Sequence, residues 1–487
     1  MQANKKILKF AMLSILWFWG SMFLLSYAED TADQDVPTVE DAKVFNEAYQ
    51  WVKKAEALMG TPKENSEEQA GYYLKATQIK PDFLEAQYNL GLIYANQNKM
   101  ADAARCFEEV LKIDPDFEGI HFLLATTYRE AGEVENAIKA LQGGLEKNPE
   151  DRKMRRALVS LQIMQQMDEG AIENLQIIVN EDPTDSASRM DLALLYQRNN
   201  MLEKAAENYA IIAESEPGNY AAQFNHALIY LNQGNYAMAS KKLELADKIK
   251  PGSPELLERL GDAYAGNQEM EKAISTYNNA LKFDPENETL YTKLGFSLAN
   301  LDRKEEAIKA LENSARLSSR RSDVYYLLGD LYSELKRTDE AETAYKKSLD
   351  LRPEQKEVLY NLGTLYAEQE RNPEALLELK KAVQLDPDYS SAWVNIARVS
   401  ESLEMNDEAI QAHEKIIALG RGNAANYFHL GVLYVKSEMP QKSIEAFAQA
   451  VKMEPEKYRD ILLQELKKVH SVLDPIRYND SFLKILD

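Results

Sequence analysis

The sequence contains a single cysteine, Cys106, among its 487 residues. One thiol excludes an internal disulfide and any metal site built from several cysteines. Cys106 precedes Phe107 within a helical pattern of apolar residues, so we interpret it as a small side chain of the core. Catalytic signatures are also missing, because the sequence has no glycine-rich phosphate loop and no nucleophile elbow.

Histidine is scarce as well. None of the five lies at metal-ligand spacing from another histidine or from the cysteine: they are His121, His226, His413, His429 and His470. We interpret His226, which stands where a leucine-like core residue is expected, as a buried core histidine. We therefore predict no catalytic residue, no cofactor site and no metal site, and the chain is not expected to be an enzyme.

Basic residues are outnumbered. Lys and Arg total 57 against 79 Asp and Glu, which gives a net charge of −22. A body this acidic repels phosphate backbones, so nucleic acid is not an expected partner.

The amino-terminal segment 1–28 has the pattern of a targeting segment. Three lysines precede an uncharged, apolar stretch that ends at Ala28, before Glu29. This predicts either a signal peptide cleaved after Ala28 or a retained anchor, since about 20 apolar residues span a bilayer. Both alternatives export the body, leaving it periplasmic after cleavage or membrane-anchored without it. The acidic, polar segment 29–41 is predicted to be a flexible spacer.

Prolines recur at a fixed interval through the rest of the chain. Ten of the sixteen prolines stand on one register of 34 residues: Pro81, Pro115, Pro149, Pro183, Pro217, Pro251, Pro285, Pro353, Pro387 and Pro455. Proline cannot continue a helix, so each one is expected to follow a helix end.

Small residues and tyrosines keep the same interval. We count positions from the first residue of each unit, so that Leu84 is position 1 and Pro115 is position 32. Position 8 is glycine, alanine or valine in these units, and position 11 is tyrosine in most. Position 20 is a column of alanines: Ala103, Ala137, Ala171, Ala205, Ala239, Ala273, Ala307, Ala341, Ala375 and Ala409.

These columns predict a helical hairpin in each unit. In 84–117, Gly91 and Tyr94 fall on one face of a first helix, and Ala103 and Phe107 fall on one face of a second. The polar stretch 96–99 separates them. The small residues are expected where the two helices cross, with the tyrosine filling the space beside that contact.

Two helices in 34 residues, small residues at positions 8 and 20 and proline at position 32 resemble the tetratricopeptide repeat. The resemblance implies an all-α, right-handed superhelical solenoid of about twelve repeats. It divides the chain into a degenerate amino-terminal repeat at 42–83, with Gln69 in the alanine column, eleven repeats at 84–457, and a capping helix and tail at 458–487.

The resemblance also implies that first helices line a concave groove. Aromatic and asparagine side chains alternate there at positions 5 and 6, which suits the backbone of an extended peptide. The candidate groove residues are Tyr88, Asn89, Phe224, Asn225, Tyr360, Asn361, Asn395 and Phe428. The alternative is that these aromatics pack between helices.

A basic run opens the fourth repeat. It comprises Arg152, Lys153, Arg155 and Arg156, and it is either a solvated helix end or a docking point for an acidic partner.

Together these features predict a non-catalytic, exported scaffold that binds other proteins or extended peptide segments and helps to assemble an envelope or secretion complex. The alternative is a regulatory or tethering subunit of a membrane-associated enzyme, such as an exopolysaccharide glycosyltransferase system. Membrane contact is expected only through an uncleaved amino-terminal segment.

Overall fold

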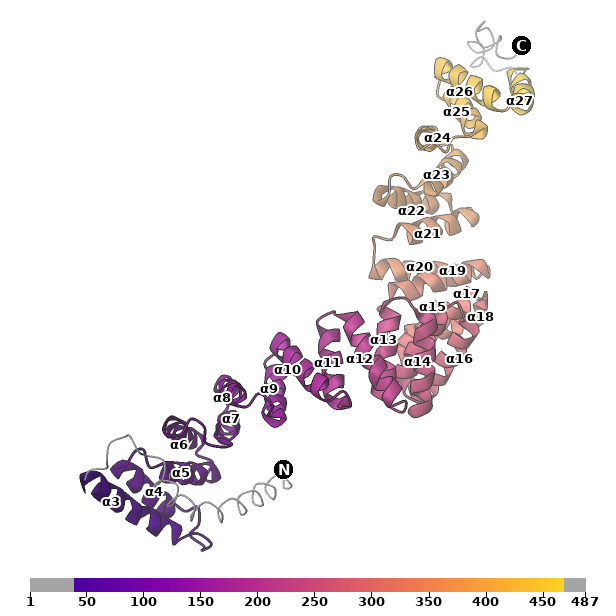
Figure 1. The fold of residues 1–487 in the computed structure, drawn as a ribbon. Coiled ribbons are helices and arrows are strands. Elements are labelled where there is room, and N and C mark those ends of the chain that lie inside the picture. Colours follow the sequence, from indigo (N-terminus) through magenta and orange to yellow (C-terminus); the bar gives the residue numbers. More distant parts are fainter. Residues whose placement is uncertain (1–38, 468–487) are drawn as a thin grey trace. The chain divides into compact units, whose positions relative to one another are not determined.

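The computed structural model describes residues 39–467, which form twenty-five helices and no strand (Figure 1). The predicted all-α solenoid of repeats is thereby confirmed, while its right-handed superhelical path stays a prediction. The predicted leader, residues 29–38 of the spacer and the tail beyond residue 467 lie outside the described residues. Among residues 39–467, no helix is both long and apolar enough to cross a membrane.

The helices belong to two compact units, with the border inside α12, between Asn208 and Tyr209. The helices of unit 1 are α3 (Val39–Glu56), α4 (Glu67–Ile79), α5 (Leu84–Asn96), α6 (Met100–Ile113), α7 (Ile120–Ala131), α8 (Val134–Lys147), α9 (Arg152–Met164), α10 (Asp168–Glu181), α11 (Ser186–Arg198) and the start of α12 (Leu202–Ser215).

Unit 2 holds the remainder of α12 and all later helices. These are α13 (Tyr220–Asn232), α14 (Tyr236–Ile249), α15 (Pro254–Gly266), α16 (Met270–Phe283), α17 (Glu288–Asn300), α18 (Lys304–Leu317), α19 (Ser322–Glu334), α20 (Thr338–Leu351), α21 (Lys356–Glu368), α22 (Asn372–Leu385), α23 (Ser390–Ser402), α24 (Asn406–Ala418), α25 (Ala424–Lys436), α26 (Pro440–Met453) and α27 (Pro455–Lys467).

Each repeat is a hairpin of one odd-numbered first helix and one even-numbered second helix, from α3/α4 to α25/α26. Consecutive helices pack against each other from α3 to α11 in unit 1 and from α13 to α27 in unit 2 (Figure 1). Inside each unit, a repeat therefore buries its apolar faces between its own two helices and against the adjacent repeats of that unit, as expected of a solenoid.

The small-residue columns lie where the two helices of a hairpin cross, as predicted. All ten alanines at position 20 have no exposed surface. At position 8, glycine faces the large side chain at position 24 of the same repeat. A Cβ added to Gly91 would lie 2.6 Å from the Phe107 ring, and one added to Gly329 would lie 2.5 Å from Tyr345. The large residue at position 24 therefore requires a small residue at position 8.

The tyrosines at position 11 do more than fill space. Four of their hydroxyl groups donate hydrogen bonds to the glutamate at position 25 of the preceding repeat: Tyr128 to Glu108, Tyr264 to Glu244 (2.8 Å), Tyr332 to Glu312 (2.7 Å) and Tyr434 to Glu414 (2.6 Å). Tyr366 instead donates to Glu342 at position 21 (3.0 Å). The column thus links consecutive repeats as well as packing against the crossing.

Helix ends follow the repeat too. Prolines at position 32 come directly after a C-cap residue, as Pro115 follows Asp114 at the end of α6. The turn inside each hairpin has a left-handed residue at position 15, which the sequence showed only as a polar turn. Nine of these residues are not glycine and have φ between 56° and 63°: Asn98, Gln166, Asn200, Gln268, Asp302, Lys336, Glu370, Glu404 and Glu438.

The first repeat starts earlier than predicted, because α3 begins at Val39 and so includes the last three residues of the predicted spacer 29–41. Gln69 is only 2% exposed. Its amide donates to the carbonyl of Ala55 (3.0 Å) and accepts from the Asn65 amide (2.7 Å). A polar side chain replaces alanine here because it holds the long loop between α3 and α4.

The array ends in a covering helix, as predicted, but α27 begins at Pro455 rather than at residue 458. Proline is well suited to a first helical turn, where its missing N–H is not needed. Tyr458 and Leu462 are buried, and the Tyr458 ring lies 5.2 Å from the Phe428 ring. The helix thereby covers the apolar end of the last repeat.

Candidate partner-binding surface

Side chains from consecutive repeats meet at a recurring place on the first-helix side. The side chain at position 24 packs against position 8 of its own repeat and extends to the side chain at position 9. The side chain at position 6 of the next repeat lies beside these two. We call this place an inter-repeat niche and name each niche by one of its residues.

The Tyr277 niche, formed by Asp262, Tyr277 and Lys293, is filled by the protein itself. The Tyr277 hydroxyl donates to Asp262 at 2.9 Å. Lys293 donates to the same carboxylate at 2.7 Å and to Glu258 at 2.6 Å. Tyr277 is 2% exposed, and this burial raises the pKa of its phenol, which therefore stays protonated and acts as a donor.

The Tyr345 niche, formed by Asp330, Tyr345 and Asn361, is also filled. The Tyr345 hydroxyl and the Asn361 amide both donate to Asp330, at 2.7 and 2.8 Å. Burial raises the pKa of Asp330 although three side chains donate to it. The predicted groove residue Asn361 thus serves a contact between two repeats.

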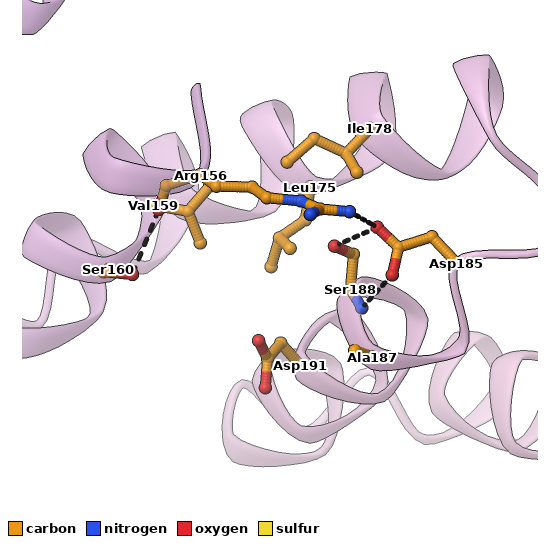
Figure 2. A pocket seen from close by; sticks show the side chains of 9 residues that line it. All are labelled: Arg156, Val159, Ser160, Leu175, Ile178, Asp185, Ala187, Ser188 and Asp191. Carbon is orange, nitrogen blue, oxygen red and sulfur yellow. Dashed lines mark hydrogen bonds and ion pairs between the residues drawn. The ribbon is translucent and has the colours of Figure 1, made fainter. Parts of the chain in front are cut away.

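The Asp191 niche, formed by Ser160, Leu175 and Asp191 in unit 1, is open. Leucine at position 24 does not fill the space, and a cavity of about 250 Å³ lies between α9, α10 and α11 (Figure 2). Ser160 donates to the backbone carbonyl of Arg156 at 3.0 Å. Among the described residues, Asp191 has no hydrogen-bond or ion-pair partner.

Charge in this cavity is unbalanced. Arg156 forms an ion pair with Asp185 at 2.6 Å, and Ser188 donates to Asp185 as well (Figure 2). Asp191 lies apart from that pair. Partial burial, with a smaller contribution from the negative charge of Asp185, raises the pKa of Asp191. The open niche therefore presents an uncompensated carboxylate to solvent.

The local sequence explains why this niche is open. Position 8 of the fourth repeat is Val159 instead of glycine, and it is 4% exposed. A branched side chain there leaves no room for an aromatic ring at position 24, where Leu175 stands. Leucine is shorter than tyrosine and has no hydroxyl group, so Asp191 receives no bond from it.

The predicted aromatic groove residues all contact aromatics of their own chain. Their centroid separations are 5.1 Å for Tyr88 and Phe117, 5.6 Å for Phe224 and Tyr220, 5.2 Å for Tyr360 and Tyr389, and 5.2 Å for Phe428 and Tyr458. Phe224 and Tyr220 both lie on α13, whereas the other three contacts join different segments, as in the alternative considered above. Contact of these aromatics with a partner stays a prediction.

The predicted asparagines are largely engaged between repeats. Asn89 is 9% exposed, Asn225 hydrogen-bonds Tyr209, and Asn395 donates to Thr364 at 3.0 Å. With Asn361, three of the four amides join neighbouring repeats. Their role toward a partner also stays a prediction.

The basic run of the fourth repeat is paired within the chain. Its contacts are Arg152 with Asp182 (3.2 Å), Lys153 over the Phe122 ring (3.9 Å), Arg155 with Asn174 (3.0 Å) and Arg156 with Asp185 (2.6 Å). Arg155 is only 8% exposed. Docking of an acidic partner at this run remains a prediction.

A cluster that the sequence spacing did not reveal occupies what we call the His413 niche, formed by Glu401, His413 and His429. His413 stands at position 24 and His429 at position 6, as in the other niches, but Glu401 stands at position 12 instead of position 9. Both imidazoles bond to the Glu401 carboxylate, at 2.7 and 3.0 Å. Burial opposes ionisation of Glu401, but the two bonds lower its pKa to about 2, and the bond to Glu401 raises the pKa of His429. Spacing along one helix could not reveal this cluster, because its members belong to three helices.

Comparison with known families agrees with this architecture. A model of the cilia and flagella-associated protein 70 C-terminal domain matches residues 186–414. Three models of the tetratricopeptide repeat match residues 64–116, 97–161 and 424–457. No curated protein matches the chain.

Several solved structures are similar to parts of the chain. YrrB, described as a tetratricopeptide-repeat protein with an unusual peptide-binding site, is 22% identical over 38% of this chain and 96% of its own, with a TM-score of 0.36. PilF of Pseudomonas aeruginosa is 23% identical over 45% and 97%, with a TM-score of 0.36. The Naa15/Naa10 complex bound to HypK is 16% identical over 92% and 80%, with a TM-score of 0.43.

The stacked hairpins and their 34-residue register place the chain among the all-α repeat proteins. With the family matches, the chain is a tetratricopeptide-repeat protein.

Proposed function

We propose that the chain is a protein-binding scaffold that holds an extended, basic segment of a partner on the first-helix side of unit 1. We further propose that it does so on the exported side of a membrane, in the assembly of an envelope or secretion complex. Tetratricopeptide repeats are a binding architecture, so the function depends on the side chains that the scaffold presents.

The observation that carries this proposal is the open Asp191 niche. Its cavity of about 250 Å³ has room for one side chain of a partner, and the Asp191 carboxylate at its wall has no partner among the described residues. A lysine or arginine would supply the missing charge, and its aliphatic stem would cover Leu175 and Ile178. The net charge of −22 favours approach of a basic segment over an acidic one.

The test compares two single-charge variants of the full chain, captured from mildly solubilised membranes through a carboxyl-terminal tag. Asp191→Asn removes the free carboxylate of the niche. The matched control, Glu135→Gln, removes one negative charge from an exposed position on a second helix, α8, of the same unit.

We expect partners with lysine- or arginine-rich segments to be lost from Asp191→Asn and retained by Glu135→Gln. Equal recovery with both variants would exclude the niche as the binding site. If catalytic activity co-purifies and is lost only with Asp191→Asn, the chain is instead the tethering subunit of an enzyme.

Location needs its own measurement. In intact cells, the tagged body should resist added protease until the outer barrier is permeabilised, and it should then be cleaved while a cytoplasmic marker stays protected. Protection that persists until the inner membrane is broken would contradict export.

A further inference from the structure

The His413 niche brings together three side chains of a kind that binds metal ions. Glu401 comes from the last turn of α23, His413 from α24 and His429 from the second turn of α25. Nε2 of His413 lies 2.7 Å from Oε1 of Glu401, and Nδ1 of His429 lies 3.0 Å from Oε2. These donor atoms all lie within 4.8 Å of one another.

Comparison of position 24 across the repeats shows that His413 is unusual there. Position 24 is tyrosine, phenylalanine or leucine in every other repeat, and none of these residues is more than 4% exposed. His413 is equally buried, with a side chain that is 6% exposed. An imidazole in this place gives up water on both ring nitrogens, so it needs partners that the apolar residues do not.

We propose that Glu401, His413 and His429 form a binding site for one divalent transition-metal ion of the zinc class. Two imidazole nitrogens and one carboxylate oxygen are a donor set that suits zinc, and three protein ligands leave a fourth place for water or a partner's side chain. This site goes beyond the proposed function and does not depend on it.

The three side chains must adjust their spacing when an ion enters. In a tetrahedral zinc site with bonds of 2.0–2.1 Å, donor atoms lie about 3.3 Å apart. The two hydrogen-bonded edges, which run to different oxygens of Glu401, are 2.7 and 3.0 Å long, so the carboxylate must withdraw slightly. The third edge joins the two imidazole nitrogens, which lie within 4.8 Å of each other and must take up the same spacing. His429 is 51% exposed and Glu401 29% exposed, so the ion and its water reach the site from solvent.

Asn426 couples the site to the start of α25. Its amide nitrogen lies 3.3 Å from Nδ1 of His413, while its oxygen accepts from the Asn423 amide as half of the α25 capping box. A metal on Nε2 moves the His413 proton to Nδ1, which then requires an acceptor. The Asn426 amide must turn its oxygen to the ring and release Asn423, so binding loosens the first turn of α25.

The experiment titrates Zn²⁺ into the untagged full chain by calorimetry, and then Co²⁺ for its visible absorption. Three variants remove one ligand each: His413→Leu, Glu401→Gln and His429→Asn. Leucine at position 24 and asparagine at position 6 occur in other repeats, as in Leu379 and Asn361, so these variants should fold, and circular dichroism checks this. The matched control is His226→Leu, which removes a buried imidazole from α13.

We expect one Zn²⁺ per chain for the wild type and for His226→Leu, with Co²⁺ absorption typical of four-coordination. Each ligand variant should bind at least tenfold more weakly and lose that absorption. Absence of stoichiometric binding to the wild type, or equal affinity in all variants, would overturn the proposal.

Asn426→Asp gives an independent readout. A carboxylate at this position accepts from Nδ1 and still has an oxygen for the Asn423 amide, so zinc should bind about tenfold more tightly. Tightening supports coordination through Nε2 of His413, and weakening contradicts it.

Discussion

The Asp191 niche in unit 1 and the Tyr277 niche in unit 2 occupy the same three positions of the repeat but differ in what fills them. In unit 2, Gly261 leaves room for Tyr277, whose hydroxyl bonds to Asp262, and Lys293 compensates the charge. In unit 1, valine at position 8 is paired with leucine at position 24, and a cavity of about 250 Å³ remains beside Asp191.

This difference shows how a repeat array acquires an open cavity without losing its register. One exchange at the helix crossing, from a glycine–tyrosine pair to a valine–leucine pair, keeps the core packed. The same exchange removes the hydroxyl that would have reached the first helix. Stability and site formation are therefore decided by the same pair of positions.

The largest effect is expected from opening the Tyr277 niche. Tyr277→Ala removes a fully buried ring and should lower the stability of the α15–α17 region by about 3–5 kcal/mol. Native-state hydrogen exchange of that region measures the loss, since repeats unfold locally. Tyr277→Phe keeps the ring and should cost only about 1 kcal/mol. Similar losses of stability for both variants would mean that the hydroxyl, not the ring, supplies most of the stabilisation in this niche.

Filling the Asp191 niche should come next. Leu175→Tyr places a ring against Val159 and should destabilise α9–α11 by about 1–3 kcal/mol through overpacking. Adding Val159→Gly recreates the pair found in unit 2 and should recover most of that loss. A double-mutant cycle in urea measures this coupling, and additive effects would contradict the exchange described above. The double variant should also lose the basic partner that we propose for this niche.

A third comparison concerns pH. In unit 2, burial opposes ionisation of Glu342, but bonds from Arg371, Lys346 and Tyr366 lower its pKa to about 2. Tyr196 of unit 1 stands at the same repeat position as Tyr366. Its hydroxyl accepts a hydrogen bond from the neutral amide of Gln176, at 2.6 Å, and not from a charged group.

Because the folded pKa of Glu342 lies below its ordinary value of 4.5, the stabilisation is present above pH 4.5 and is lost as the pH falls toward 2. After allowance for solvent screening, it amounts to roughly 1–2 kcal/mol. The free energy of unfolding of Glu342→Gln, relative to wild type, should be lower at neutral pH and nearly equal at about pH 2. A difference independent of pH would show that the ion pairs contribute nothing.

The smallest effect is expected from Asp191 itself. Its pKa is raised, so its charge is unfavourable in the folded state at neutral pH. Asp191→Asn should therefore stabilise unit 1 by a few tenths of a kcal/mol. This gain should shrink as the pH falls below the raised pKa, because the wild-type carboxyl is then neutral as well. Thermal unfolding at both pH values measures it, and destabilisation at neutral pH would reveal a partner within the chain.

The periodicity of the sequence was enough to predict the helical hairpins and their crossings. Alanine at position 20 allows its helix to approach the other helix of the hairpin, and proline at position 32 follows the end of that helix. Both effects are local, so spacing along the sequence was enough to predict them. Niche contacts could not be predicted in this way. Asp262, Tyr277 and Lys293 lie on three helices and belong to two repeats, so their contact depends on how those helices cross. The same reason hid the His413 cluster and the engagement of Asn361 and Asn395.

The sequence by itself determined the register, the hairpins and the covering helix, because residue size and the missing N–H of proline set local backbone geometry and helix distance. Only the tertiary structure decided which polar side chains bond within the chain and which remain available. Hydrogen bonds and metal coordination depend on atomic positions to within fractions of an ångström, and no spacing rule supplies that precision. Within residues 39–467, Asp191 has no hydrogen-bond or ion-pair partner, and Glu401 lies between two imidazoles, because of how three helices meet at each niche.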